Sequence, residues 1–299
     1  MNDVIPSDKT MAVSKLDWRQ HAYRADLADA RLRSQVRAEA FVDGWPAEVG
    51  NTALPLLRRP SLDAPMDSQV LPGEAVRVFE KSDDWAWVQC GHDGYVGYVA
   101  SNGLTKPAAE PATHVVCARE TVVLSDAEQV CAPLYNLSMG TAVRVTETGK
   151  RFHTLASGGY VFAEHLRAVD AIEADWVDVA QRLMGLPYLW GGRGASGIDC
   201  SGLVQVALAA CGIGCPRDSD QQAAGLGQAV ALDPALWRRG DAIYVRGHVV
   251  LDAGDGSVIH ATGYRWSVIV EERQQCLDRL ARMDRPVIAV RRPEVASDA

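Results

Sequence analysis

The sequence lacks two features that would tie the protein to a membrane. No run of about 18 apolar residues exists in the 299-residue chain, so we expect no membrane-spanning helix. The first ten residues, Met1–Thr10, also lack the charged and then apolar pattern of a secretory signal. Both absences favour a cytoplasmic protein, although an exported chain whose leader had been removed would look the same.

The sequence also lacks any cysteine spacing that is typical of a disulfide framework. Its 7 cysteines are scattered and odd in number, which favours a reducing compartment. The pair Cys211 and Cys215 has no second ligand pair close by, so we predict no zinc site.

An excess of positive charge is missing as well. The formal net charge is −8, which argues against nucleic acid or an anionic membrane as a partner. The hydrophobic fraction of 47% and the charged fraction of 23% are ordinary for a globular protein, and the length predicts two or three domains. We expect the protein to be a monomer.

The first half of the chain contains an internal repeat. Residues 1–45 are polar, and Tyr23–Val36 in this segment fits either a short helix or an arm that lies on the rest. Beyond them, Gly73–Glu80 (GEAVRVFE) matches Gly140–Glu147 (GTAVRVTE) at a spacing of 67 residues, among short β-type segments. We predict two small β-barrels, at 46–107 and 108–169, and the alternative is one larger β-sandwich.

The second half changes from helical to strand patterns. Helices are predicted at Glu173–Leu183, after Cys200, and from Asp218 to Gly225. Four strand-like segments follow, and they span residues 242–245, 248–252, 257–260 and 287–290. Helices first and antiparallel strands after them predict an α+β domain at 170–293, with a helix packed on one face of the sheet.

One cysteine stands where a nucleophile is expected. In Tyr188–Ser201 (YLWGGRGASGIDCS), Cys200 follows an acidic residue and begins an apolar helix. The unpaired N–H groups and the positive dipole end of a helix N-terminus favour the thiolate, which is the reactive form of cysteine. The glycines after Trp190 allow a substrate to approach the backbone closely. The Cys200 amide and the Tyr188 hydroxyl are candidate donors to an oxyanion, and packing is the alternative role for Tyr188.

Two histidines flank a predicted hairpin downstream of this cysteine. Gly254–Gly256 lies midway between His248 and His260 and is a hairpin signal. An odd loop or a bulge puts both rings on one face of the sheet, and we expect a three-residue turn to do so. His248 would then be the base for Cys200, and His260 would hold its ring in the productive tautomer.

These motifs carry a family resemblance. The blocks PYLWGG (187–192), DCSG (199–202), RGD (239–241), HV (248–249) and IHA (259–261) resemble those of NlpC-type papain-like cysteine peptidases of bacterial cell-wall peptides. The tandem barrels resemble the SH3-like domains that precede this catalytic domain in some members. The resemblance therefore implies two SH3-like β-barrels followed by a papain-like α+β domain, with Cys200 as nucleophile, His248 as base, His260 as third polar residue and Tyr188 near the oxyanion.

The subgroup resembled, γ-D-glutamyl-L-diamino acid endopeptidases, implies a set of substrate contacts. It uses an Asp-Ser pair, here Asp218 and Ser219, to hold the free amine of an N-terminal L-Ala; capping of a helix is the alternative role of Asp218. It also draws an acidic residue from the first barrel, for which Asp63 is the candidate. The other candidate groove residues are Trp190, Tyr95 and Tyr98.

The expected function is that of a cytosolic cysteine endopeptidase without metal or organic cofactor. Its expected substrate is a murein stem peptide with a free N-terminal L-Ala, cut between D-glutamate and the diamino acid during cell-wall recycling. One alternative is a Cys–His amidase or acyltransferase that acts on another substrate. The other is a non-catalytic protein that binds the cell wall through its barrels.

Overall fold

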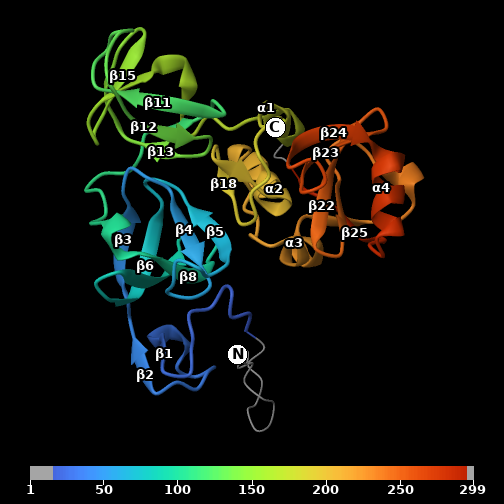
Figure 1. Ribbon diagram of the computed structural model, residues 1–299, viewed down its shortest axis with the longest axis horizontal. Coiled ribbons are helices and arrows are strands. Elements are labelled where there is room, and N and C mark those ends of the chain that lie inside the picture. Colours follow the sequence, from blue (N-terminus) through green and yellow to red (C-terminus); the bar gives the residue numbers. More distant parts are fainter. Residues whose placement is uncertain (1–15, 295–299) are drawn as a thin grey trace.

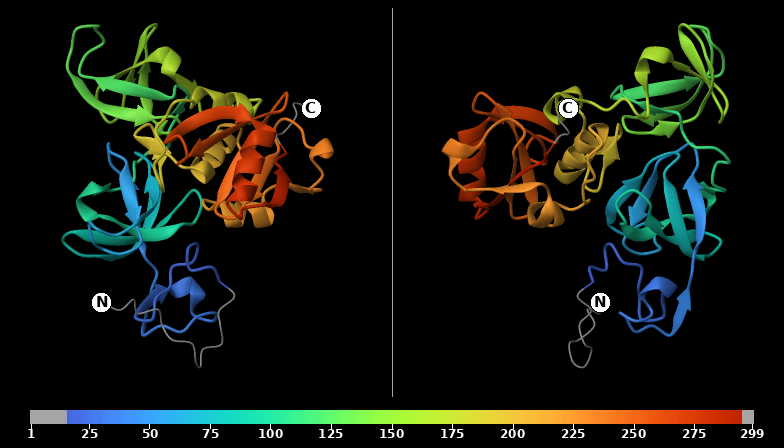
Figure 2. Two further views of the ribbon diagram at one scale, coloured as in Figure 1. Left: turned by 45° about the vertical axis from the view of Figure 1, so that its right-hand side comes forward. Right: turned by 180° about the vertical axis from the view of Figure 1, so that it is seen from behind.

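The computed structural model describes residues 16–294. Two small β-domains lie one above the other on one side of the molecule, and the C-terminal α+β domain lies beside both (Figure 1). The views in Figure 2 show the same arrangement from two further sides. Within residues 16–294, no helix is long and apolar enough to cross a membrane. Met1–Thr10, on which the expectation about a signal rests, lies outside the described residues.

The N-terminal segment is an arm rather than an α-helix. It contains a parallel pair of short strands, β1 (Leu27–Asp29) and β2 (Ala40–Val42), with one 3-10 turn after β1. Ala22 of the arm is buried against Phe79 and Trp87 of the first β-domain. We call the described part, residues 16–44, the N-terminal arm.

The first β-domain is a single seven-stranded sheet in the order β5-β4-β8-β7-β6-β3-β9. Side chains alternate along its aromatic strand: Val88 packs in the interior of the domain, whereas Trp87 faces the arm. Its strands are β3 (Trp45–Val49), β4 (Leu54–Leu57), β5 (Met66–Val70), β6 (Ala75–Lys81), β7 (Trp85–Cys90), β8 (Val96–Ala100) and β9 (Leu104–Thr105).

The second β-domain has a core of its own, and its strands form two sheets, in the orders β13-β10-β17 and β12-β11-β16-β15-β14. Gly73 and Gly140, the matched glycines of the repeat, both adopt positive φ (75° and 85°), because each forms the turn before a strand of its domain. The strands are β10 (His114–Val116), β11 (Glu120–Leu124), β12 (Pro133–Ser138), β13 (Ala142–Val143), β14 (Val145–Thr148), β15 (Phe152–Leu155), β16 (Tyr160–Phe162) and β17 (Leu166–Ala168).

The C-terminal domain is built on a six-stranded sheet in the order β20-β25-β21-β22-β23-β24. Its strands are β20 (Gln228–Val230), β21 (Ala242–Val245), β22 (His248–Gly254), β23 (Ser257–Thr262), β24 (Ser267–Glu272) and β25 (Val287–Arg292), and a short hairpin, β18 (Arg193–Gly194) and β19 (Gly197–Ile198), precedes them. The helices are α1 (Trp176–Arg182), α2 (Cys200–Ala210), α3 (Ser219–Gly225) and α4 (Arg273–Arg282).

Helices cover both faces of this sheet, whereas the sequence predicted one covered face. Helices α1 and α2 pack with Tyr244 and Leu251, and α4 packs with Ile243 and Val250 from the opposite face. Sequence patterns did not reveal α4 because its buried stripe consists of little more than Cys276 and Leu280. The expected fold class, two β-barrels followed by an α+β domain, is confirmed; the domain boundaries stay predictions.

Candidate active site

A capped helix start fixes the position of the Cys200 sulfur. Asp199 is the N-cap of α2: one carboxylate oxygen accepts from the Gly202 amide at 2.7 Å, and the other accepts from the Gly191 amide at 2.8 Å. The Val249 amide, beside His248 on β22, lies close enough to the Cys200 sulfur to lower the pKa of its thiol. The cap thus holds the predicted nucleophile against the strand that carries the predicted base.

A buried ion pair between Arg217 and the N-cap residue Asp199 stabilises this helix start. The Arg217 guanidinium binds both carboxylate oxygens of Asp199, at 2.9 and 2.7 Å, and donates to the hydroxyls of Ser201 and Ser68. Arg217 is 1% exposed, and Ser68 belongs to β5 of the first β-domain. The ion pair therefore links the first β-domain to the catalytic helix.

The hairpin places the two histidines on one face of the sheet. Leu251 of β22 lies opposite Ile259 of β23, and this register puts His260 opposite Val250, on the same face as His248. The predicted juxtaposition is therefore confirmed.

The predicted three-residue loop is wrong in its details. Gly254 pairs with Ser257, so the turn itself has two residues, Asp255 and Gly256, both at positive φ. A bulge between Asp252 and Gly254 supplies the odd offset instead.

A chain of polar contacts runs back from His248. Its Nε2 lies 2.8 Å from His260 Nδ1, and His260 Nε2 lies 2.9 Å from Glu271 Oε1. Arg279 of α4 donates to the other carboxylate oxygen of Glu271 at 2.7 Å. Sequence reasoning missed Glu271, because its strand β24 was not assigned and nothing local marks the residue.

These contacts assign the ring protons. A carboxylate only accepts, so His260 carries its proton on Nε2, towards Glu271. Nδ1 of His260 then accepts from the Nε2–H of His248. The unprotonated atom of His248 is Nδ1, which is the atom available to take the proton of Cys200.

Burial keeps the nucleophile and the base neutral in the free protein. Burial, and next the charge of Asp199, raise the pKa of Cys200 to about 12. Burial lowers the pKa of His248 to about 3 and that of His260 to about 4. Desolvation of Cys200 therefore opposes the thiolate that the helix N-terminus is expected to favour.

The buried histidines predict a loss of stability on acidification. The pKa of both rings lies below the ordinary value of about 6.5, so between about pH 6.5 and 4 the unfolded chain binds more protons than the folded one. The free energy of unfolding should fall as pH drops through this window. Urea unfolding at pH 7, 6 and 5 measures this fall, and His260→Gln should make it shallower. An equal pH dependence in both proteins would contradict the expectation.

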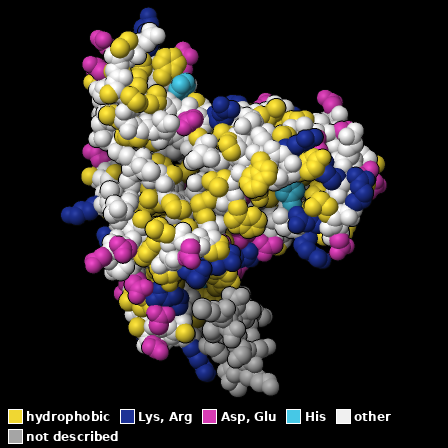
Figure 3. Space-filling view, in the orientation of Figure 1, with side chains coloured by type: hydrophobic (Ala, Val, Ile, Leu, Met, Phe, Trp, Pro, Cys, Tyr) yellow, Lys and Arg dark blue, Asp and Glu magenta, His cyan; other side chains and the backbone are white. Residues whose placement is uncertain are grey.

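The site opens into a cavity of about 530 Å³ between the arm, the first β-domain and the catalytic domain. Acidic and basic side chains are mixed below a hydrophobic area on the face shown in Figure 3. The cavity contains six of the predicted site residues: Tyr95, Tyr188, Trp190, Cys200, Asp218 and Ser219. Gly247, which precedes His248, lines it as well.

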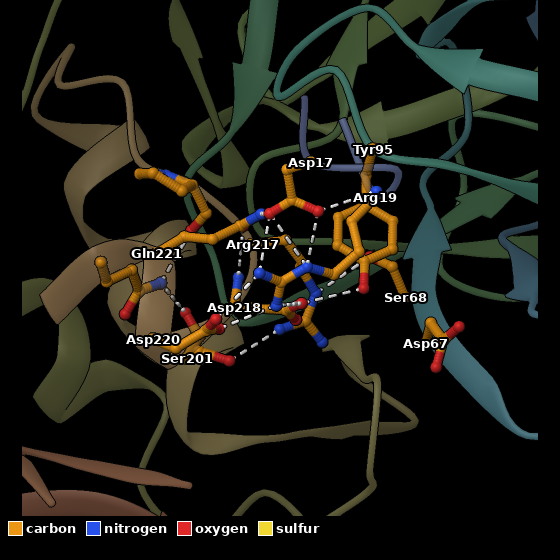
Figure 4. Close-up of polar contacts among 12 residues, drawn as sticks. Asp17, Arg19, Asp67, Ser68, Tyr95, Ser201, Arg217, Asp218, Asp220 and Gln221 are labelled. Carbon is orange, nitrogen blue, oxygen red and sulfur yellow. Dashed lines mark hydrogen bonds and ion pairs between the residues drawn. The ribbon is translucent and has the colours of Figure 1, made fainter. Parts of the chain in front are cut away.

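Asp218 is held by side chains from two other parts of the chain. Its Oδ2 accepts from the Tyr95 hydroxyl at 2.9 Å and from the Arg19 guanidinium at 2.8 Å (Figure 4). Asp218 is also the N-cap residue of α3, so the capping alternative and the pocket position hold together. Ser219 begins α3 and lines the cavity beside it.

Tyr188 and Trp190 stand on the loop before α2. The half-buried ring of Tyr188 packs edge-on against Trp266, with ring centroids 5.9 Å apart. Burial, and next the charges of Cys200 and Asp199, raise the pKa of Tyr188 to about 12, so its hydroxyl stays a donor. Trp190 is 61% exposed and lines the cavity.

The structure places Asp63 and Tyr98 outside the cavity, so these two predictions are wrong. Asp63 lies in an exposed turn, where its carboxylate accepts from the Ser61 hydroxyl, and it does not line the cavity. Tyr98 accepts from Arg24 of the arm at 2.8 Å. The first β-domain instead contributes Asp67 of β5, which sequence reasoning missed.

Two groups of side chains have metal-ligand chemistry. One is Cys90, His92 and Asp93, and the other is His260, Glu271 and Cys276. In the first, His92 contacts Asp93 at 2.9 Å, and in the second Arg279 already holds Glu271. In both groups, some of the possible ligand atoms thus already contact other side chains among the described residues.

Comparisons with known proteins agree with this geometry. The model of the NlpC/P60 family matches residues 185–280, and that of the bacterial dipeptidyl-peptidase Sh3 domain matches residues 56–104. Dipeptidyl-peptidase 6 of Lysinibacillus sphaericus is 27% identical over 230 residues, which are 69% of this chain and 84% of the relative. A gamma-D-glutamyl-L-lysine dipeptidyl-peptidase of Bacillus cereus is 27% identical over 228 residues, 66% of this chain and 67% of the relative.

A solved structure supports the fold over most of the chain. An NlpC/P60 family protein from Bacillus cereus superposes with a TM-score of 0.71 at 20% sequence identity, and the match covers 83% of this chain and 99% of that chain. The overall fold is therefore shared with a solved structure.

Proposed function

Because residues 185–280 of this chain form an NlpC/P60 domain, we propose that the protein is a cysteine peptidase that cleaves the γ-D-glutamyl-L-diamino acid bond of bacterial cell-wall peptides. The observation that carries this proposal is one cysteine at a capped helix start, beside a His–His–Glu chain, at the wall of an acidic cavity. The preferred substrate has a free N-terminal L-Ala.

The reaction begins with transfer of a proton from the thiol. As Cys200 Sγ attacks the γ-carbonyl carbon, its proton passes to Nδ1 of His248, and the carbonyl oxygen becomes an oxyanion. His260 and Glu271 stabilise the positive ring through the chain of contacts. Collapse of the tetrahedral intermediate expels the amine of the diamino acid, which takes the proton from His248.

A thioester on Cys200 remains after this step. Nδ1 of His248 then removes a proton from a water molecule, which attacks the thioester carbonyl and releases the γ-carboxyl of D-glutamate together with the thiol. Helix-start amides lack partners within their helix, so the Cys200 amide is a donor to both oxyanions. The protonated Tyr188 hydroxyl is the second donor.

The acidic cavity accounts for the preference for a free amine. Five aspartates line it, with two arginines: Asp17, Asp67, Asp199, Asp218, Asp220, Arg19 and Arg58. Arg217 neutralises Asp199 from behind, so an excess of negative charge remains for an ammonium.

Acetylation of the substrate's amine tests this proposal. We expect kcat/KM for N-acetyl-L-Ala-γ-D-Glu-diaminopimelate to be at least about tenfold lower than for the free tripeptide, since one charge-assisted contact is lost. Asp218→Asn should lower cleavage of the free peptide and leave the acetylated one nearly unchanged. Equal cleavage of both peptides by the wild-type protein would exclude the amine role of Asp218.

We also propose that the enzyme acts as a monomer on released wall peptides in the cytoplasm. The 7 cysteines are all free, which is typical of a reducing compartment. A cavity closed on one side by the arm suits a short peptide better than cross-linked wall.

A further inference from the structure

The N-terminal arm forms part of the cavity wall. Asp17, Trp18 and Arg19 line the same cavity as Cys200. The arm is fixed to the first β-domain by its backbone: the Arg19 carbonyl accepts from the Val96 amide at 2.7 Å, and the Gln20 carbonyl accepts from Gln89 at 2.8 Å. Such contacts hold the side chain of Arg19 at a defined place.

The guanidinium of Arg19 joins three carboxylates. It donates to Asp218 Oδ2 at 2.8 Å and grips Asp220 through two hydrogen bonds of 2.8 Å (Figure 4). Its Nε and Nη2 bind Asp17 of the same arm, at 3.0 and 2.7 Å, and Asp17 also accepts from Gln221 of α3 at 2.8 Å. The arm thus grips the first turn of α3, which carries the proposed amine-binding residues.

This arrangement leaves room for a cation at Asp218. The Arg19 guanidinium faces three carboxylates, so these four groups together carry a net charge of −2. A carboxylate has about four acceptor directions, and Arg19 and Tyr95 occupy two of those on Asp218. Burial raises the pKa of Asp218, whereas the Tyr95 hydrogen bond and the charges of Arg217 and Arg19 oppose this rise and favour the ionised form that binds ammonium.

We infer that the N-terminal arm is part of the substrate site, in which Arg19 is a positioning residue that holds the carboxylate of Asp218 for the substrate's ammonium. Asp17 in turn orients Arg19. The inference rests on the proposed function and adds to it a specificity element outside the two matched domains, 56–104 and 185–280.

The test compares full-length Arg19→Ala, Arg19→Lys and a matched control, Arg24→Ala. Arg24 lies on the same arm and binds Asp26 and Glu80, away from the cavity. Each protein is assayed for kcat and KM on L-Ala-γ-D-Glu-diaminopimelate and on its N-acetylated form. The ratio of the two kcat/KM values measures amine recognition. A general loss of stability would lower both values alike and leave their ratio unchanged.

We expect Arg19→Ala to raise KM for the free peptide about tenfold, with a smaller change in kcat and none for the acetylated peptide. Arg19→Lys should restore part of the ratio, and Arg24→Ala should leave it unchanged. An unchanged ratio in Arg19→Ala would overturn the inference. An increase in kcat/KM for the free peptide would overturn it too, since it would mean that Arg19 occupies the place of the ammonium. Failure of the wild-type protein to cleave either peptide would instead overturn the proposed function, and this role of the arm with it.

Discussion

Cys200→Ala is expected to lower kcat for the tripeptide by about 10⁴- to 10⁶-fold, as removal of the nucleophile does in related acyl-transfer chemistry. The reason is that no other described cysteine lines the cavity. Steady-state assays of tripeptide cleavage measure the loss.

Cys117→Ala is the matched control, because Cys117 lies in the second β-domain and is partly exposed. The activity of the Cys117→Ala protein should equal that of the wild-type protein. Residual activity above about one hundredth of wild type in a folded Cys200→Ala protein would contradict the assignment of the nucleophile.

Arg217→Met is expected to lower the free energy of unfolding by about 3 to 5 kcal/mol, which is the usual cost of leaving one partner of a buried ion pair uncompensated. Asp199 would lose two hydrogen bonds to a buried cation, and the first β-domain would lose its contact through Ser68. Urea unfolding of the full chain measures the change.

Arg58→Met serves as the comparison for Arg217→Met. Arg58 also binds an aspartate through two contacts, to Asp67, but its side chain is 51% exposed. We expect a cost of at most about 1 kcal/mol there. Similar costs for both variants would show that burial of the Arg217–Asp199 pair adds nothing.

The parts of the site that the sequence predicted are those whose signals are local. Cys200 stands between an N-cap aspartate and an apolar helix, and the two histidines flank a glycine-rich turn. Short-range patterns of this kind follow from helix and hairpin geometry alone. Gly73 and Gly140, the matched glycines of the repeat, each mark a turn before a strand, and their match predicted two β-domains.

The parts that the sequence did not reveal depend on contacts between distant segments. Arg217 meets Ser68 across 149 residues, and Arg19 meets Asp218 across 199. No local sequence pattern near any of these residues indicates such a contact. The helix N-terminus that favours the Cys200 thiolate is visible in the sequence, whereas the burial that raises the pKa of this thiol is not.

Cys200, with His248 as its base, is expected to cleave the bond between D-glutamate and the diamino acid. Mass spectrometry of L-Ala-γ-D-Glu-diaminopimelate after incubation with the wild-type protein and with Cys200→Ala tests it most directly. The wild-type protein should release L-Ala-γ-D-Glu and free diaminopimelate, and the variant should leave the tripeptide intact. Release of alanine in place of the dipeptide, or the same products from the variant, would contradict the account.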